Sequence, residues 1–392
     1  MRILVLAPHP FYIDRGTPID VDILVRALCE LGHEVHLATL HAGEDRHYEG
    51  LTIHRIDEPK GVGMPKPGFS GAKLKCDVKL FALAKRLIRE IKPDVIHAGE
   101  EAVFMARWFK ATRGIPYIYD MDSSIAQQMV EQIGSLRLLS PVFHAFEGIG
   151  VKGAIACAPV CHALADVARK QGAKRSVTLH DISQLDVDSL QPTGWLRKEY
   201  GISADSTLLV YCGNLQVYQG VGLLIEGMAE AIKGGADVDA VIAGGEPDQI
   251  KDCQKQAQSL GIADRIHLIG RWPADRLGEL LIEGDILTAP RIRGVNTPQK
   301  VFPYLHTGRA VLVTDLPTHS QILTQDICRL APADPVGFGT AIADLAKDET
   351  IRKNLGKAGR KFAEAEHTYP AHLRRVGELY AEVSAAIGSK KG

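Results

Sequence analysis

Three cationic side chains, Arg291, Arg293 and Lys300, follow the apolar run ILTA and lie close together in the sequence. Thr297 between them is a good N-cap residue, and Pro298 suits the first position of a helix. Backbone N–H groups at a helix start can bind an anion when cations surround them. These residues therefore predict an anion site, most readily for a phosphate. A basic surface loop ahead of a kinked helix fits the same residues equally well.

We expect this helix to open at Asn296 or Thr297 and to stop at Gly308, which can take a left-handed conformation. Two of its residues fit poorly. Lys300 would lie in the first turn, where the helix dipole disfavours a cation by about 0.3–1 kcal/mol. Pro303 would lie further inside, where it costs roughly 3 kcal/mol in a straight helix. Such misfits tend to mark functional or strained sites.

Polar residues also end two apolar strands in the first half of the chain. DVIHAG carries His97 and is followed by Glu100, and PYIYDMDSS ends in Asp120, Asp122 and Ser123. The ends of parallel strands meet at one edge of a sheet, so these side chains are candidate acids, bases or hydroxyl-binding groups. Asp122 could equally cap a helix that begins near Ser123.

The order of elements at the amino terminus predicts a parallel sheet. A strand at residues 2–7, an amphipathic helix at 21–33 and a strand at 34–39 form a βαβ unit. The loop before the helix contains the candidate contact residues His9, Arg15, Gly16 and Thr17. Gly16 could bring backbone close to a ligand or could be a plain turn glycine, and the loop lacks the GxGxxG pattern of a dinucleotide site.

A second α/β series begins at STLLVYCGN, after the polar and unpatterned run DISQLDVDSLQPTG. The chain is too long for one ordinary core. We therefore expect Rossmann-like domains at residues 1–182 and 190–368, and a helix at 369–392 that returns to the first domain.

The bulk composition excludes some classes of function. The net charge is −1, so no overall field recruits nucleic acid. The seven cysteines show no paired CxxC spacing and suit small buried residues in a reducing cytosol. Cys157, Cys161 and His162 could be imagined as metal ligands, but no second cluster accompanies them, so we expect no metal site.

Membrane contact is open on the sequence alone. No apolar run approaches the roughly 18 residues that cross a bilayer, and we expect a cytoplasmic protein. Residues 74–92 form a basic amphipathic helix, which could lie against anionic lipid at the inner face of the membrane. An ordinary helix that packs on a sheet and has a solvated charged face is the favoured interpretation.

The order of motifs in the second half resembles the GT-B glycosyltransferases, in particular the large retaining group that includes glycogen and sucrose synthases. It rests on four stretches: YCGNLQVYQGVGLLIEGM, VIAGG, IHLIGRWPADRLGELLIEGDILTAP and NTPQKVFPYLHTGRAVLVTD. The resemblance covers nearly the whole chain. It implies an α/β fold of two doubly wound domains that face a central cleft.

The resemblance also implies donor-binding residues. Gly16 and Gly213 would bring backbone to the diphosphate, and Gly244 and Gly245 would approach the base or ribose. The backbone of Asn296 and Thr297 would lie near the sugar and phosphates.

Several positions depart from the pattern of that group. Asn214 and Gln219 stand where it has the diphosphate-binding Arg and Lys. Val295 and Pro303 stand where it has two glutamates, the second of which commonly binds ribose, and Asp122 replaces a strand-end His. Losing two cations from a diphosphate site would cost several kcal/mol, since a hydrogen bond to a charged group contributes about 1.5–3 kcal/mol. The available replacements are Arg291, Arg293 and Lys300.

The resemblance implies a retaining hexosyl-type transferase that moves a sugar from a nucleotide-sugar to a hydroxyl of a glycan or lipid-linked acceptor, in polysaccharide or glycoconjugate assembly. It implies no cofactor and no metal, with Asp122 and His97 positioning sugar hydroxyls. A degenerate homologue that binds a glycan or a partner enzyme without catalysis is the alternative. A non-transferring sugar-nucleotide epimerase is less favoured.

Overall fold

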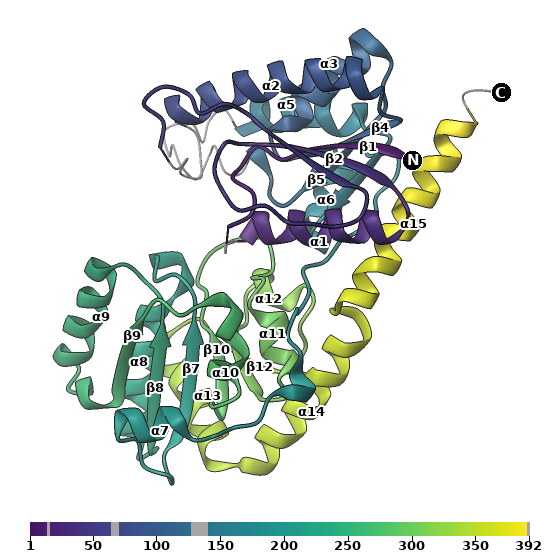
Figure 1. Cartoon of the computed structure of the whole chain (residues 1–392). Helices are drawn as coiled ribbons and strands as arrows, with labels where there is room; N and C mark the ends of the chain where they lie inside the picture. Colours follow the sequence, from purple (N-terminus) through teal and green to yellow (C-terminus); the bar gives the residue numbers. More distant parts are fainter. Residues whose placement is uncertain (14–15, 64–69, 127–139, 390–392) are drawn as a thin grey trace. The chain divides into compact units, whose positions relative to one another are not determined.

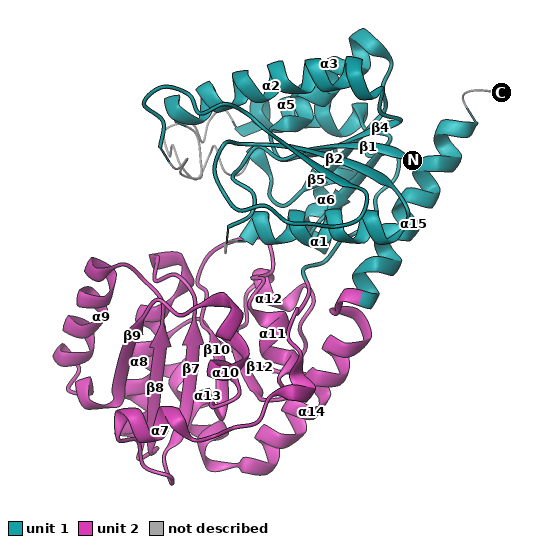
Figure 2. Cartoon of the chain, viewed as in Figure 1, with its two compact units in different colours: residues 1–181, 370–392 teal, residues 182–369 magenta. Residues whose placement is uncertain are grey.

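A computed structural model of the chain describes all residues except 14–15, 64–69, 127–139 and 390–392. Arg15 and much of the Pro/Gly-rich loop before residue 71 therefore lie outside the described residues. The chain divides into two compact units, residues 1–181 with 370–392, and residues 182–369 (Figure 2).

Unit 1 is built on a six-stranded parallel sheet of order β3-β2-β1-β4-β5-β6. The strands are β1 (Arg2–Leu6), β2 (Glu34–Thr39), β3 (Leu51–Arg55), β4 (Val95–Gly99), β5 (Tyr117–Met121) and β6 (Ala156–Pro159). The central strands β1, β4 and β5 are apolar and almost entirely buried, as expected for parallel strands with both faces covered.

The helices of unit 1 follow the strands in alternation. They are α1 (Gly16–Glu30), α2 (Gly71–Ile91), α3 (Ala102–Arg113), α5 (Ser140–Gly153), α6 (His162–Lys170) and α15 (Tyr369–Gly388). Helices α2, α3 and α5 lie side by side over one face of the sheet (Figure 1). Their inner residues, such as Leu80, Ala106 and Val151, form one core with the strands. From Pro370 onward α15 belongs to this unit.

Unit 2 repeats the architecture with a parallel sheet of order β12-β11-β10-β7-β8-β9. The strands are β7 (Thr207–Cys212), β8 (Val238–Ala243), β9 (Ile266–Gly270), β10 (Ile286–Ala289), β11 (Ala310–Thr314) and β12 (Arg329–Ala331). The helices are α7 (Trp195–Tyr200), α8 (Val221–Lys233), α9 (Pro247–Ser259), α10 (Leu277–Leu281), α11 (Val301–His306), α12 (Pro317–Ser320), α13 (Pro335–Lys347) and α14 (Glu349–Glu366), with a 3-10 turn η3 (Val217–Gln219) before α8. In chain order both sheets run 3-2-1-4-5-6, so the predicted α/β fold with two Rossmann-like units is confirmed.

The helix predicted from Asn296 or Thr297 begins later than expected. Its first residue is Val301 and its N-cap is Lys300. Pro303 is consequently its third residue, where a missing N–H has no intrahelical partner to lose, so the expected cost of a kink does not arise. Gly308 has φ 75° and stands just after the C-cap, as predicted.

Two further expectations concern metals and membranes. Among the described residues, no group of three or more His, Cys, Asp or Glu side chains could hold a metal ion. Cys157 and Cys161 are buried free cysteines. Within the same described ranges, no helix has the length and apolarity needed to span a bilayer.

Candidate functional site

A turn follows the carboxyl end of β7, and its backbone packs closely against the backbone of the turn after β8. The Tyr304 hydroxyl accepts from the Cys212 N–H at 2.8 Å and donates to the Cys212 carbonyl at 3.1 Å. The Tyr304 hydroxyl thereby forms hydrogen bonds with both the N–H and the carbonyl of Cys212. Strand β10 does not supply these bonds, because it pairs with β7 only at Leu209 and Val210. A Cβ on Gly213 would collide with Lys300 Nζ, and one on Gly244 would collide with the Gly213 carbonyl. Packing against backbone therefore requires glycine at position 244, whereas a Cβ at position 213 would displace the end of the Lys300 side chain.

The ammonium group of Lys300 lies beside this turn, next to Tyr211 and Gly213. Its ammonium group donates to the Tyr211 hydroxyl at 2.9 Å and lies 4.0 Å from the centroid of that ring. Burial, with a smaller contribution from the charge of Arg291, lowers the pKa of Lys300 to about 7. Among the described residues no carboxylate forms an ion pair with Lys300. The structure thus holds a partly buried amine against a glycine turn without an anionic protein partner.

Arg291 organises the loop between β10 and α11. Its Nε donates to the Arg293 carbonyl at 2.7 Å, and its two terminal nitrogens donate to the Asn296 carbonyl at 3.2 Å and to Asn296 Oδ1 at 3.4 Å. The guanidinium also lies 5.2 Å from the centroid of the Tyr218 ring. Arg291 therefore holds its own loop in shape and adds positive charge near Lys300, whereas Arg293 is exposed to solvent.

The remaining predicted residues of this loop face α12. The Asn296 carbonyl also accepts from the Thr318 hydroxyl at 2.7 Å. Thr297 is buried, and its hydroxyl has no hydrogen-bond partner. Thr297 is consequently not the N-cap that the sequence predicts. Its backbone is irregular, and a turn at Gln299 and Lys300 leads into α11.

His319 on α12 is a candidate that the sequence reasoning missed. Its Nδ1 lies 3.0 Å from the Thr314 carbonyl, which can only accept, so the neutral ring carries its proton on Nδ1. Its Nε2 is buried without a hydrogen-bond partner. Burial lowers the pKa of His319 to about 3, and the charges of Arg291 and Lys300 contribute to the shift. The position just after the end of β11 is the signal that could have identified it.

The other predicted donor residues line the turns after β7 and β8. Asn214 is exposed, and its side chain accepts from the Gln216 N–H at 3.2 Å. Gln219 is buried at the end of η3, just before Gly220, whose Cβ would collide with the Pro290 carbonyl. Gly245 has φ 88° and packs on Leu215. The turns therefore bring Gly213, Gly244 and Lys300 together, while Asn214 points into solvent.

In unit 1, His97 does not lie where the sequence predicts. It occupies the middle of β4, fully buried, and its Nδ1 lies 2.9 Å from the Tyr380 hydroxyl of α15. The two rings are stacked, with centroids 6.1 Å apart, and His97 Nε2 lies 3.1 Å from Asp120 Oδ2. The apolar strand continues past His97 to Gly99, so the ring is directed into the packing between the sheet and α15.

Carboxyl groups gather at the carboxyl edge of the same sheet. Burial, and then the charges of Asp120 and Glu100, raise the pKa of Asp122 well above its usual value. Burial, and then the charge of Glu101, raise the pKa of Glu100 to about 7. Glu100 also has φ 45°, a strained conformation for a residue other than glycine that tends to occur at functional sites.

Asp20 and Asp181 join this group, although they lie far apart in the sequence. They share a hydrogen bond, and burial raises the pKa of Asp181 to about 7 and that of Asp20 well above its usual value. Carboxyl groups with a pKa near 7, here Glu100 and Asp181, can exchange protons with hydroxyls or accept hydrogen bonds from them. Gly16, at the start of α1, has open space at its Cβ position.

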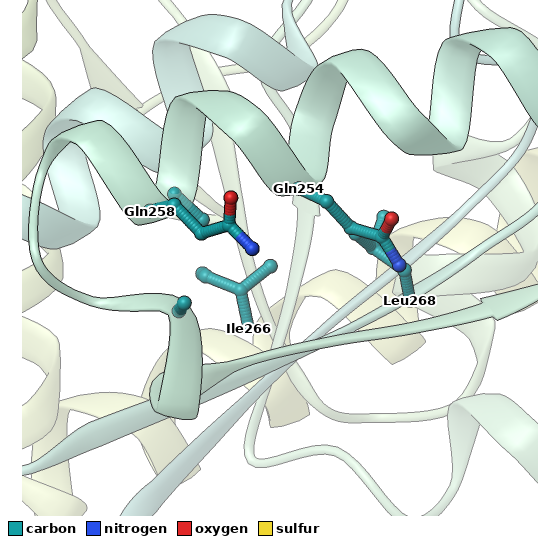
Figure 3. Close-up of a pocket in the computed structure, with 6 residues that line it drawn as sticks. Gln254, Gln258, Ile266 and Leu268 are labelled. Atoms are coloured by element: carbon teal, nitrogen blue, oxygen red, sulfur yellow. The ribbon is translucent and has the colours of Figure 1, made fainter.

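A separate cavity lies between α9 and β9 (Figure 3). It has a volume of about 310 Å³ and is lined by Gln254, Ala257, Gln258, Ala263, Ile266 and Leu268. None of these side chains carries a charge, so the cavity lacks the cations that a diphosphate requires.

Comparisons with known proteins identify the family of the chain. Residues 16–180 match the family model for a glycosyl transferase 4-like domain, and residues 206–348 match the model for glycosyl transferases group 1. A curated relative, the putative glycosyltransferase YtcC of Bacillus subtilis, is 24% identical over 195 residues, which is 48% of this chain and 48% of that protein. The match thus spans about half the length of the relative.

Solved structures show the same fold over nearly the full chain. A sucrose-phosphate synthase from Thermosynechococcus elongatus has a TM-score of 0.77 and 16% identity, with 98% of this chain and 99% of that chain covered. Anabaena Alr3699/HepE in complex with UDP-glucose has a TM-score of 0.75 and 14% identity, with 97% and 99% covered.

Proposed function

Because the chain belongs to the group 1 glycosyltransferases of the GT-B fold, we propose that it transfers a hexosyl group from a nucleoside diphosphate sugar to an acceptor hydroxyl, with retention of configuration. The observation that carries this proposal is Lys300, whose ammonium group is held against the Gly213 turn without a protein anion among the described residues. A diphosphate would supply that anion.

The proposed chemistry is stabilisation of a leaving group. Donor breakdown places negative charge on the departing diphosphate, and preorganised cations and backbone N–H groups stabilise such charge in the transition state. Lys300 is the main cation, and the Arg291 charge adds to it. The departing phosphate takes the proton of the acceptor hydroxyl in this scheme, so neither a protein nucleophile nor a metal is required.

Unit 1 would hold the acceptor through its carboxyl groups. Asp122 and Glu100 lie at the carboxyl edge of that sheet, and both pKa values are raised, that of Glu100 to about 7. A carboxyl group donates a hydrogen bond to a sugar hydroxyl when protonated and accepts one when ionised, and either bond would orient the acceptor. Relatives in the fold include WaaG, a glycosyltransferase involved in lipopolysaccharide biosynthesis. By analogy, a glycan or lipid-linked glycan in cytoplasmic polysaccharide assembly is the proposed acceptor class.

The test is the release of nucleoside diphosphate from a panel of nucleotide-sugars by the purified protein. We expect release from at least one donor and a roughly 10–100-fold weaker donor affinity in Lys300→Met, because a hydrogen bond to a charged group contributes about 1.5–3 kcal/mol. Lys353→Met is the matched control, since Lys353 is an exposed lysine on α14 that pairs with Glu349. Absence of both binding and release with every donor would refute the proposal.

The alternative is a non-catalytic protein of the same fold. It is favoured by Pro303, which lies buried in the first turn of α11 where the resemblance implies a ribose-binding Glu. Such a protein would bind a glycan without releasing nucleoside diphosphate. Glycan binding that is unchanged in Lys300→Met, together with no release, would support this alternative.

A further inference from the structure

Six large apolar side chains are exposed on the outer side of α2, α3 and α5, and we call them the apolar patch. Each is between 41% and 65% exposed: Leu74, Val78, Trp108, Val142, Phe146 and Ile149. The opposite sides of the three helices form the core with the sheet, so the apolar patch faces away from it. The proposed transfer reaction does not use these residues.

Two ring contacts, each between a residue of the apolar patch and a half-buried phenylalanine, join the three helices. Phe81 of α2 meets Trp108 of α3 with ring centroids 5.1 Å apart, and Phe104 of α3 stacks on Phe146 of α5 at 4.2 Å. Figure 1 shows the three helices over one face of the sheet of unit 1. A surface formed by three packed helices is held in shape before any partner arrives.

The charge around the apolar patch is positive. Lys85 and Arg89 are exposed on α2, and helical spacing places them on the same stripe as Leu74 and Val78. Exposed basic residues beside this stripe are Lys75 and Arg86. Long basic side chains can extend their charged ends past an apolar surface to reach anions.

The acidic side chains of these helices do not offset that charge. Asp77 is paired with Lys73, and Glu147 is buried against Ser124. Glu90 is exposed and lies 3.9 Å from Arg86. Over the described parts of α2, α3 and α5, these are the three acidic residues, so an excess of exposed cations remains.

We propose that the apolar patch and its basic stripe bind the surface of a bilayer that contains anionic lipid. Apolar side chains that insert at the level of the headgroups, together with cations that meet anionic headgroups, are the two contributions that hold an amphipathic surface on a membrane. A protein partner would have to satisfy the same exposed cations, and its binding would not depend on lipid charge.

The test uses vesicle flotation of the full chain with phosphatidylcholine alone and with equal parts of phosphatidylcholine and phosphatidylglycerol. We expect binding to the anionic vesicles only. It should weaken when salt rises from about 0.1 M to about 1 M, which shortens the Debye length from about 10 Å to about 3 Å.

Two pairs of substitutions separate the apolar and electrostatic contributions. Val142→Ser with Ile149→Ser should lower binding to anionic vesicles about tenfold or more. Lys85→Glu with Arg89→Glu should do so by more than about tenfold. The matched controls lie in unit 2 and should bind as the wild type does. Leu260→Ser with Val336→Ser changes two apolar residues that are also exposed, and Lys251→Glu with Lys255→Glu changes the net charge by the same amount as Lys85→Glu with Arg89→Glu.

The proposal is overturned if the wild type floats equally with both vesicle types, or with neither. It is also overturned if the two substituted pairs bind like their controls. A concentration-dependent dimer in light scattering that both pairs abolish, without vesicle binding, would assign the surface to a second copy of the chain. Vesicle binding is measured without donor or acceptor, so its failure is distinct from failure of the transfer reaction.

Discussion

Lys300 combines two properties that its sequence position does not reveal. As the N-cap of α11 it lies near the positive end of a helix, and its side chain is desolvated against Tyr211 and Gly213. Burial, together with the charge of Arg291, disfavours the protonated form and lowers the pKa of Lys300 to about 7. An anion bound beside it would favour protonation and raise that pKa again.

This coupling predicts the pH dependence of nucleotide binding. If diphosphate binding raises the pKa of Lys300 from about 7, binding takes up a proton above pH 7. The affinity should then fall by about tenfold per pH unit between about pH 7.5 and 9, where the phosphate, with a pKa near 6, keeps its charge. Calorimetric titration with a nucleoside diphosphate measures this slope.

Lys300→Met supplies the control for that slope, because methionine has a similar length and does not titrate. Its affinity should be lower at pH 7.5 and nearly independent of pH, so that the two proteins converge at high pH. Parallel pH curves for the wild type and Lys300→Met would show that Lys300 does not take up the proton.

At the scale of elements, apolar runs predicted the strands well because the buried strands of a parallel sheet need little else. The start of α11 was predicted wrongly because tertiary contacts outweighed local capping: the Asn296 carbonyl is bound by Thr318 and Arg291, and Thr297 is buried. His319 was missed although it follows the end of β11, where ligand-binding residues gather. The hydrogen-bonded pair Asp20 and Asp181 was missed because only the fold brings these two residues together.

The contact of α15 with β4 also needed the structure, since His97 was expected at a strand end. Tyr380→Phe removes the hydroxyl that lies 2.9 Å from His97 Nδ1 and leaves a buried ring nitrogen without its partner. We expect the free energy of unfolding of unit 1 to fall by about 1–3 kcal/mol, measured by urea denaturation.

Tyr200→Phe is the matched control for this substitution, because Tyr200 lies on α7 in unit 2 and is only partly buried. It should change stability by less than about 0.5 kcal/mol. If Tyr380→Phe were as stable as Tyr200→Phe, the hydroxyl of Tyr380 would not fasten α15 to the sheet.

At the scale of the whole molecule, the two units bury ionisable groups of opposite kinds. Unit 1 holds Glu100 with its pKa raised from 4.5 to about 7, so between these values the folded state binds more protons than the unfolded state, and stability falls as pH rises. Unit 2 holds Lys300 with its pKa lowered from 10.5 to about 7. In that window the unfolded state binds more protons, and stability rises with pH.

Two substitutions isolate these opposite dependences in calorimetric unfolding. Glu100→Gln should become more stable relative to the wild type between pH 5 and 8, by on the order of 2 kcal/mol, because the neutral amide avoids the cost of ionising a buried carboxyl. Lys300→Met should lose its advantage over the wild type as pH rises from about 7 to about 10, where the buried amine is neutral in the folded state. Buried histidines are present in both the wild type and each variant, so their contribution to the pH dependence cancels when the two free energies of unfolding are subtracted. The stability of Glu100→Gln relative to the wild type should therefore rise with pH, and that of Lys300→Met should fall. If both changed in the same direction, either Glu100 or Lys300 would not be buried in the folded protein, and the site role assigned to that residue would be wrong.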